Sequence, residues 1–150
     1  MRAIAVLCAV LSLSAADRPN FTGDWKMNPD KSSFGQLPRP LEYERTIKHK
    51  DPIIHMSVRQ VTSAVDQTFD MTLRTDGRET RNQIGKGESR TTGKWVGRDL
   101  QFTTSRGFEE GDVVSKETWS LSGDGKILTS VTVMQTPRGT VEVRMVLDKQ

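Results

Sequence analysis

The feature that most constrains this chain is a regular alternation of short β-forming runs and turns from Leu41 onward. The runs are rich in valine, isoleucine, threonine and aromatic residues, and turn residues interrupt them about every 10 residues, as in an all-β barrel or sandwich. Asp76-Gly77 suits a tight hairpin turn, and Pro137-Arg138-Gly139 suits a slightly longer hairpin. Short connections make neighbouring runs pair with each other. We therefore predict an all-β fold, an antiparallel up-and-down β-barrel of about 8–10 strands with meander topology. The predicted strands are 41–49, 53–61, 65–75, 78–84, 88–96, 99–106, 112–121, 126–136 and 139–148.

Residues at alternate positions of each strand face the same side of the sheet, which assigns an inner face to the longer strands. The inner faces carry large apolar residues together with a few charged ones. A buried charge is costly unless it has a partner. A ligand in the lumen could supply that partner, so we expect the ligand to bind against these inner faces. The predicted ligand-binding residues are Tyr43, Arg45, Phe69, Phe102, Arg106, Glu117 and Trp119.

A further strand is expected around Trp25, in the stretch Phe21-Thr22-Gly23-Asp24-Trp25-Lys26. Gly23 lies on the same face as Trp25, so another group can approach closely there. A tryptophan at the start of a barrel can plug its closed end, and its N–H then needs a partner. Gly23 and Trp25 are therefore the predicted structural signature. An ordinary core tryptophan after a turn glycine is the alternative.

The F-x-G-x-W-K pattern resembles the N-terminal motif of the intracellular lipid-binding proteins, and its G-x-W core resembles that of the lipocalins. Both are calycins, a group of small antiparallel barrels, with ten strands in the lipid-binding proteins and eight in lipocalins. The resemblance implies that arginine and tyrosine side chains hold a ligand carboxylate. It also implies a helical lid, but 27–40 is too short and too rich in proline for two helices. The C-terminal Arg-x-Tyr pattern of the lipid-binding proteins is replaced here by Arg144-Met145-Val146.

The first 16 residues have the features of a secretory signal peptide: Arg2, then an apolar run from Ala3 to Leu13, then small residues. We predict a signal over 1–16 and a lipocalin-like barrel domain over 17–150; an uncleaved anchor or a buried N-terminal helix is the alternative. The one cysteine, Cys8, lies in the predicted signal, so the mature domain would have no disulfide. Export without disulfides favours a periplasmic or secreted protein of a bacterial host.

The charge balance argues against nucleic acid as a partner. Without Arg2 the chain has 21 basic and 19 acidic residues, spread evenly rather than gathered in a basic patch. His49 and His55 flank Asp51-Pro52 and could approach each other, but two histidines without a third ligand make a poor metal site. We predict no metal, no cofactor, no transmembrane segment and no catalytic residues.

Two features leave alternatives open. Arg45 and Arg106 either meet an anionic head group, or pair with Glu117 or lie at the rim in solvent. The strand at 78–84 has no apolar face, so it is either a gap that admits a ligand or a solvated hairpin.

The sequence thus predicts an exported, noncatalytic barrel that binds a small apolar, amphipathic or fatty-acid-like molecule in its lumen. The alternatives are a fully packed interaction or structural module, and an enzyme with a rim site built from His49, His55 and Glu117. The oligomeric state is not indicated.

Overall fold

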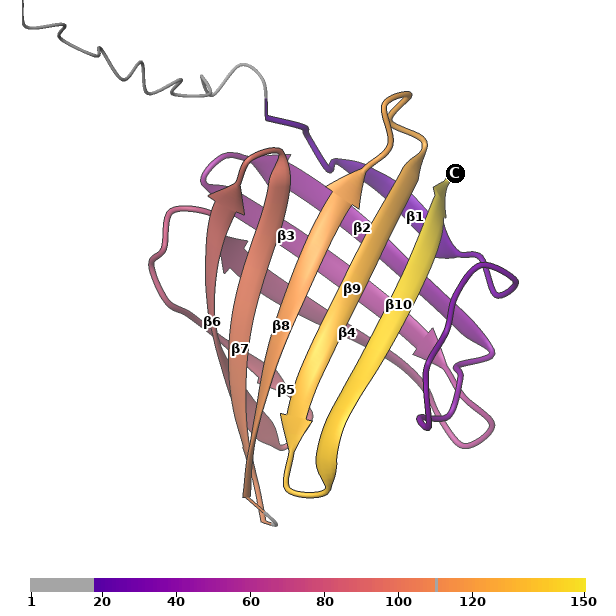
Figure 1. The fold of residues 1–150 in the computed structure, drawn as a ribbon, viewed down its shortest axis with the longest axis vertical. Helices are drawn as coiled ribbons and strands as arrows, with labels where there is room; N and C mark the ends of the chain where they lie inside the picture. The colour runs from indigo at the N-terminus through magenta and orange to yellow at the C-terminus, as the bar shows by residue number, and fades with distance from the viewer. Residues whose placement is uncertain (1–17, 110) are drawn as a thin grey trace, which may run out of the picture.

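The computed structural model describes residues 18–109 and 111–150, and within these ranges the chain folds into ten antiparallel strands (Figure 1). The predicted signal at 1–16 lies outside the described residues. Nowhere in the described part does a helix occur that is apolar and long enough to cross a lipid bilayer. The strands are β1 Gly23–Met27, β2 Glu42–Lys50, β3 Ile53–Val61, β4 Asp66–Arg74, β5 Thr80–Ile84, β6 Gly87–Val96, β7 Asp99–Phe108, β8 Gly111–Leu121, β9 Ile127–Thr136 and β10 Gly139–Lys149.

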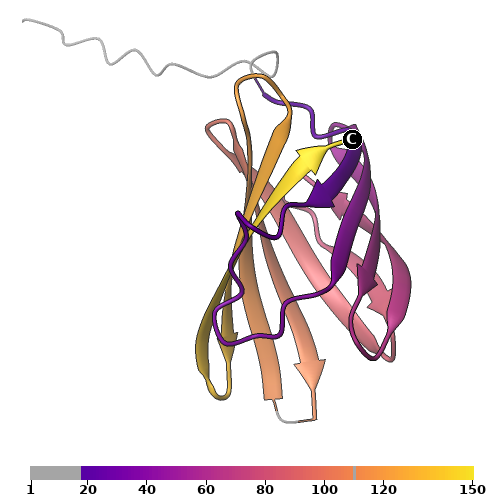
Figure 2. The ribbon, with the colours of Figure 1, turned by 90° about the vertical axis from the view of Figure 1, so that its right-hand side faces the viewer.

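The strands form one sheet in the order β4-β3-β2-β1-β10-β9-β8-β7-β6-β5. β4 and β5 do not pair, but every other strand pairs with its neighbours in sequence, and β1 also pairs with β10, with Trp25 opposite Lys149. Figure 2 shows the sheet rolled so that β2–β4 face β7–β9 across the interior. The prediction of an all-β, up-and-down meander is confirmed, and every predicted strand is present within two residues of its expected ends.

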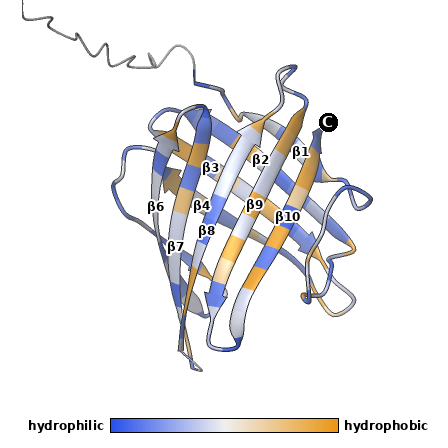
Figure 3. Cartoon of the chain, in the orientation of Figure 1, coloured by the Kyte–Doolittle hydropathy of each residue, from blue (hydrophilic) through white to orange (hydrophobic). Residues whose placement is uncertain are grey.

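Hydrophilic and hydrophobic residues alternate along parts of the strands (Figure 3), and burial follows the predicted alternation of inner and outer faces. In β2, Arg45, Ile47 and His49 are buried while the residues between them are exposed. Leu41 and Val65 are exceptions, because both lie just outside their strands. They are 68% and 50% exposed, so their expected place on the inner face is wrong.

One seam interrupts the ring: β4 and β5 are neighbours in space but are not paired by backbone hydrogen bonds. The Asn82 side chain bridges it, accepting a hydrogen bond from the Thr72 N–H (2.8 Å) and donating one to the Thr72 carbonyl (3.0 Å). Farther along, β4 meets β6 so closely that a Cβ on Gly93 would lie 2.2 Å from the Arg74 carbonyl oxygen. The sequence left open a gap or a solvated hairpin around 78–84. The structure has a seam there without a backbone ladder, bridged by the Asn82 amide, and beside it the Gly77 N–H donates to the Gly93 carbonyl (2.8 Å).

The connection between β1 and β2 contains no helix, as its prolines predict. It runs along the edge of β10 beyond the end of β1, where Ser33 and Arg144 exchange two backbone hydrogen bonds of 2.8 Å. The Ser32 hydroxyl accepts a further bond from the Val146 N–H (3.0 Å). These hydrogen bonds hold the loop against the side of the barrel. Its Gln36 and Leu37 lie at the edge of a cleft at one end of the barrel.

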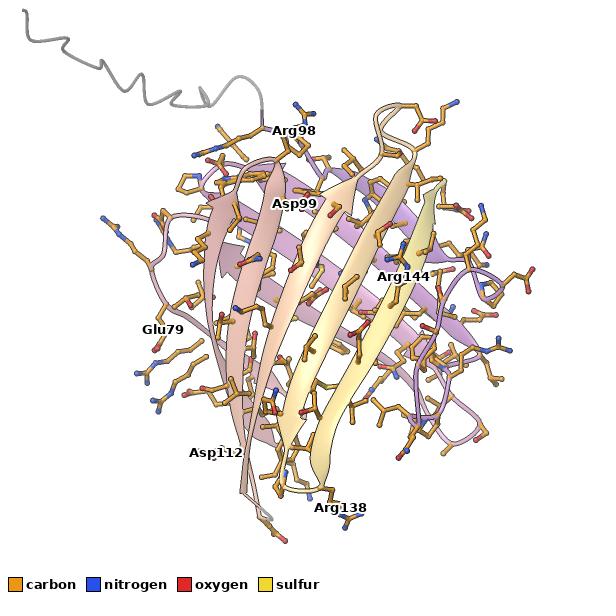
Figure 4. All side chains as sticks on the ribbon, in the orientation of Figure 1. Glu79, Arg98, Asp99, Asp112, Arg138 and Arg144 are labelled. Carbon is orange, nitrogen blue, oxygen red and sulfur yellow. The ribbon has the colours of Figure 1, made fainter. Side chains whose placement is uncertain are left out.

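The two ends of the barrel differ. We call the end with Trp25 and the turns at 51–52, 97–98 and 122–126 the closed end, and the opposite end, with the turns at 62–65, 85–86 and 137–138, the open end. Figure 4 labels Arg98 and Asp99 at the closed end, and Asp112 and Arg138 at the open end. Most of the large side chains that are almost fully buried lie in the closed half, among them Phe21, Trp25, Leu100, Trp119, Leu128 and Leu147.

Trp25 is buried at the closed end. It is 1% exposed, and its indole N–H donates to the Phe21 carbonyl at 3.0 Å. The Lys149 ammonium lies 5.5 Å from the indole ring centre. A Cβ on Gly23 would be 2.8 Å from Lys149 Cε, so a larger residue at position 23 would push this lysine away.

Candidate ligand-binding site

A polar cluster lies in the middle of the barrel, between β2 and β8 on opposite walls. Arg45 Nη1 is 2.9 Å from Glu117 Oε1, and Arg45 Nε donates a hydrogen bond to the Tyr43 hydroxyl (3.1 Å). The guanidinium carbon is 5.3 Å from the ring centres of both Tyr43 and Trp119. Four predicted ligand-binding residues are therefore neighbours: Tyr43, Arg45, Glu117 and Trp119.

Glu117 is held by several donors at one oxygen. Its Oε1 accepts hydrogen bonds from the Trp119 indole N–H and the Ser130 hydroxyl, both at 2.6 Å, in addition to the ion pair with Arg45. Arg45 Nη1 is close to this oxygen but makes no well-directed hydrogen bond with it, so their attraction is chiefly electrostatic. The sequence did not single out Ser130, because the strand at 126–136 was not assigned an inner face.

The ionisation states follow from this geometry. Burial by itself favours the neutral form of each group. For Arg45, the neighbouring Tyr43 and Glu117 outweigh burial and raise its pKa. For Glu117, burial is likewise outweighed by Arg45, Ser130 and Trp119, so its pKa is lowered. Burial raises the pKa of Tyr43, which stays a neutral phenol. The cluster is thus one cation and one anion with no net charge.

Phe102 and Phe69 occupy different environments. Phe102 is 2% exposed and meets Trp119 edge to face, with ring centres 4.9 Å apart. It belongs to the packed core of the closed half. Phe69 is partly exposed on β4 and packs against that core from the open side. Of these two rings, only Phe69 therefore lies where solvent reaches the interior.

Arg106 does not join the central cluster. It lies on β7 near the open end, where its Nη2 donates to the Ile84 carbonyl (2.8 Å) and its guanidinium carbon is 5.0 Å from the Phe108 ring centre. Arg106 Nε is buried and has no hydrogen-bond partner within the described residues. Of the two arginines left open by the sequence, Arg45 pairs with Glu117 and Arg106 does not.

A cleft of about 790 Å³ opens at the open end, bordered by the 28–41 loop and the β7–β8 and β9–β10 hairpins. Its walls are mainly apolar, and two large apolar residues on it, Leu37 and Phe108, are 39% and 50% exposed. Sequence reasoning missed both, because Leu37 is in a loop and Phe108 lies beyond the predicted end of its strand. The lining residues are Gln36, Leu37, Phe108, Glu109, Gly111, Val113, Thr136, Pro137, Arg138 and Val141.

Beyond the cleft, parts of the inner face of the barrel are also exposed. Many inward-facing residues of the open half remain partly exposed, although Ser89 is buried, whereas most of the corresponding residues of the closed half are buried. Solvent therefore enters the lumen from the open end and reaches the Glu117 side chain, which is 24% exposed. The partly exposed inner residues include Tyr43, Gln60, Phe69, Met71, Thr104, Ser115, Thr132 and Met134.

The histidines lie on opposite faces of the sheet. His49 is buried at the closed end, where Nδ1 accepts from the Phe21 N–H (3.3 Å) and Nε2 contacts Asp51 Oδ1 (3.2 Å). His55 is exposed and contacts the Thr72 hydroxyl. The expectation that the two approach each other is wrong, and neither shares a cleft with Glu117. No group of three or more metal-binding side chains is found within 18–109 and 111–150.

Comparison with known proteins identifies the fold. No family model matches the sequence, and no curated protein matches it. Solved structures do match, and together with the ten-strand meander they show that the chain has the fold of a calycin-like small β-barrel.

In particular, it resembles zebrafish ileal bile acid-binding protein in complex with cholic acid, at 14% identity and a TM-score of 0.60 over 87% of this chain and 98% of that one. It also resembles a secretory abundant heat soluble protein from Ramazzottius varieornatus, at 13% identity and a TM-score of 0.63 over 86% of this chain and 94% of that one. At such identities the likeness concerns the fold alone.

Proposed function

We propose that this protein is an exported, noncatalytic barrel that binds a small apolar or amphipathic molecule in the open half of its lumen. The observation that carries the proposal is the division of the interior: packed side chains fill the closed half, while the open half has partly exposed inner walls and an apolar cleft at its end. The structural likeness to a bile acid-binding protein solved with cholic acid supports a ligand of this class.

The size and lining of the cleft suit such a ligand. Small-molecule sites generally measure about 300–1,000 Å³ and combine apolar walls with a few fixed polar groups. Here Phe108, Val113 and Val141 provide apolar surface, while the central cluster and Thr104, Ser115 and Thr132 provide polar atoms farther in. Burying apolar ligand surface against these walls supplies about 25 cal/mol per Å².

The test uses two adjacent valines of β8. Val113 lines the cleft, whereas Val114 points outward and is 42% exposed. We expect saturable binding of a fluorescent fatty acid to the wild-type protein, followed by its fluorescence. Val113→Trp should fill the cleft and weaken binding at least about tenfold, or by about 1.4 kcal/mol, while Val114→Trp should leave binding unchanged.

Saturable binding that both variants retain would place the ligand elsewhere. Failure of fatty acids, retinoids and bile acids alike to bind the wild-type protein would overturn the proposal and favour the packed interaction module.

Export is tested separately. The signal features of 1–16 lead us to expect that the full chain, produced in a bacterium, is found in the periplasm or medium and begins at Asp17. Cell fractionation followed by mass spectrometry of the N-terminus measures both. Retention of the whole chain in the cytoplasm would contradict export without affecting the binding proposal.

A further inference from the structure

Two inward-facing arginines differ in whether a carboxylate balances their positive charge. Arg45 lies deep, in the central cluster, and Arg106 lies near the mouth. A ligand with one charged end must place that end at one depth or the other. The surroundings of the two arginines therefore bear on which way a ligand enters.

Arg45 offers no net charge to an incoming anion. It is 3% exposed, and its charge is balanced by Glu117 at 2.9 Å. A carboxylate placed at this depth would meet Glu117 as well as Arg45, and two carboxylates beside one guanidinium repel each other. Desolvating the second anion would add to the cost. The deep end of the lumen thus suits an uncharged part of a ligand.

Arg106, in contrast to Arg45, has no carboxylate partner among the described residues. Its Nη2 is bonded to the neutral Ile84 carbonyl, and within the same part of the chain its Nε is buried without a hydrogen bond. A buried donor of a cationic group left without a partner costs free energy, which an anionic acceptor can recover. The Arg106 guanidinium packs against Gly87, where a Cβ would lie only 3.0 Å from Arg106 Nε.

Arg106 lies near two separate hollows, a polar one that it lines and the apolar cleft, which share no lining residue. A hollow of about 470 Å³ reaches Arg106 and is lined also by Lys86, Glu88, Arg90 and Asp112. Glu88 is already contacted by Arg90 (3.5 Å) and Arg81 (3.8 Å). On the other side, Arg106 stands directly across from Val113 on the neighbouring strand, and its guanidinium stacks on Phe108. Both of those residues line the apolar cleft.

We propose that the ligand is a monoanionic amphiphile bound with its charged end at the mouth, on Arg106, and its apolar part pointing toward Phe69, Met71 and the central cluster. This proposal rests on the proposed function. It assigns the head group to the rim of the lumen rather than to Arg45, and it makes Arg106 the residue that distinguishes anionic from neutral ligands.

The first experiment compares dodecanoate with 1-dodecanol, each displacing a neutral fluorescent probe. We expect Arg106→Gln to weaken dodecanoate about tenfold and to change dodecanol less than about twofold. Arg106→Lys should recover part of the carboxylate affinity. Lys116→Gln is the matched control: it removes one positive charge from an exposed position on the outer face of β8 and should change neither ligand.

Equal losses for acid and alcohol would show a packing role for Arg106, and no loss for either would show no role; both results overturn the proposal. If no ligand binds the wild-type protein, the proposed function fails instead, so the two failures are distinguishable.

A second experiment reads the orientation in the unmodified protein. Trp25, Trp95 and Trp119 all lie in the closed half, with Trp119 beside the central cluster. Fatty acids brominated at the far end of the chain should therefore quench tryptophan fluorescence more strongly than acids brominated next to the carboxylate. The reverse order would place the head group deep and overturn the proposal without any variant that could misfold.

Discussion

The closed and open halves of this barrel are built from the same strands but use their inner faces differently. At the closed end, large side chains interlock around Trp25 and Trp119, and each buried indole N–H has a partner. At the open end, the same alternation brings Phe69, Val113 and Val141 to walls that stay partly exposed. The comparison indicates that one half contributes most of the stability and leaves the other free to keep space for a ligand.

The largest expected effect tests this division directly. Trp25→Ala removes a fully buried indole from the closed half and should destabilise the protein by about 4 kcal/mol. Phe108→Ala removes a half-exposed ring from the mouth and should cost less than about 1 kcal/mol. Urea unfolding followed by circular dichroism measures both. Similar losses for the two variants would refute the division of labour between the halves.

The central cluster lies at the boundary between the halves, and Glu117→Gln sharpens its role. The change leaves Arg45 buried without its counter-charge, so we expect a loss of about 3 kcal/mol. The folded-state pKa of Glu117 is below its ordinary value of 4.5. The ionised carboxylate therefore stabilises the fold above pH 4.5, and this contribution is lost as the pH falls through the lower folded-state pKa.

Unfolding measurements from pH 6 downward check the pH dependence. The wild-type protein should lose stability in acid more steeply than Glu117→Gln, which has no carboxylate at this position. Parallel curves for the two proteins would mean that Glu117 does not contribute to the acid sensitivity.

The smallest expected effect concerns the seam between β4 and β5. Asn82→Ala removes both hydrogen bonds to Thr72 and should cost about 1 to 2 kcal/mol, with faster hydrogen exchange at the Thr72 amide. Gln83→Ala, one residue along and on the exposed face, is the control and should stay within about 0.5 kcal/mol. Unchanged exchange at Thr72 in Asn82→Ala would mean that other contacts hold the seam.

The fold was predictable because its signals are local. The turn after Thr136 joins β9 and β10 in a hairpin as expected, whereas the hairpin expected at Asp76-Gly77 is absent because β4 and β5 do not pair. Alternation alone placed Arg45 and Glu117 on inner faces. Which arginine pairs with Glu117 was not predictable. Arg45, and not Arg106, is the partner, because β2 and β8 meet across the lumen, and no sequence spacing relates these two strands. Asn82 lay in a strand without an apolar face, which signalled the seam but not the residue that fastens it.

The seam has a consequence for how the molecule can fluctuate. In the ring of strands it lies on the side away from the junction of β1 and β10, where the two sequence ends of the domain meet. Separating β4 from β5 and β6 would break the two Asn82 hydrogen bonds and the backbone bond between Gly77 and Gly93, but no ladder between paired strands. Among the described strands, the wall is therefore held by fewer backbone bonds along this line than along any line between paired strands, and widening it here leaves every ladder intact.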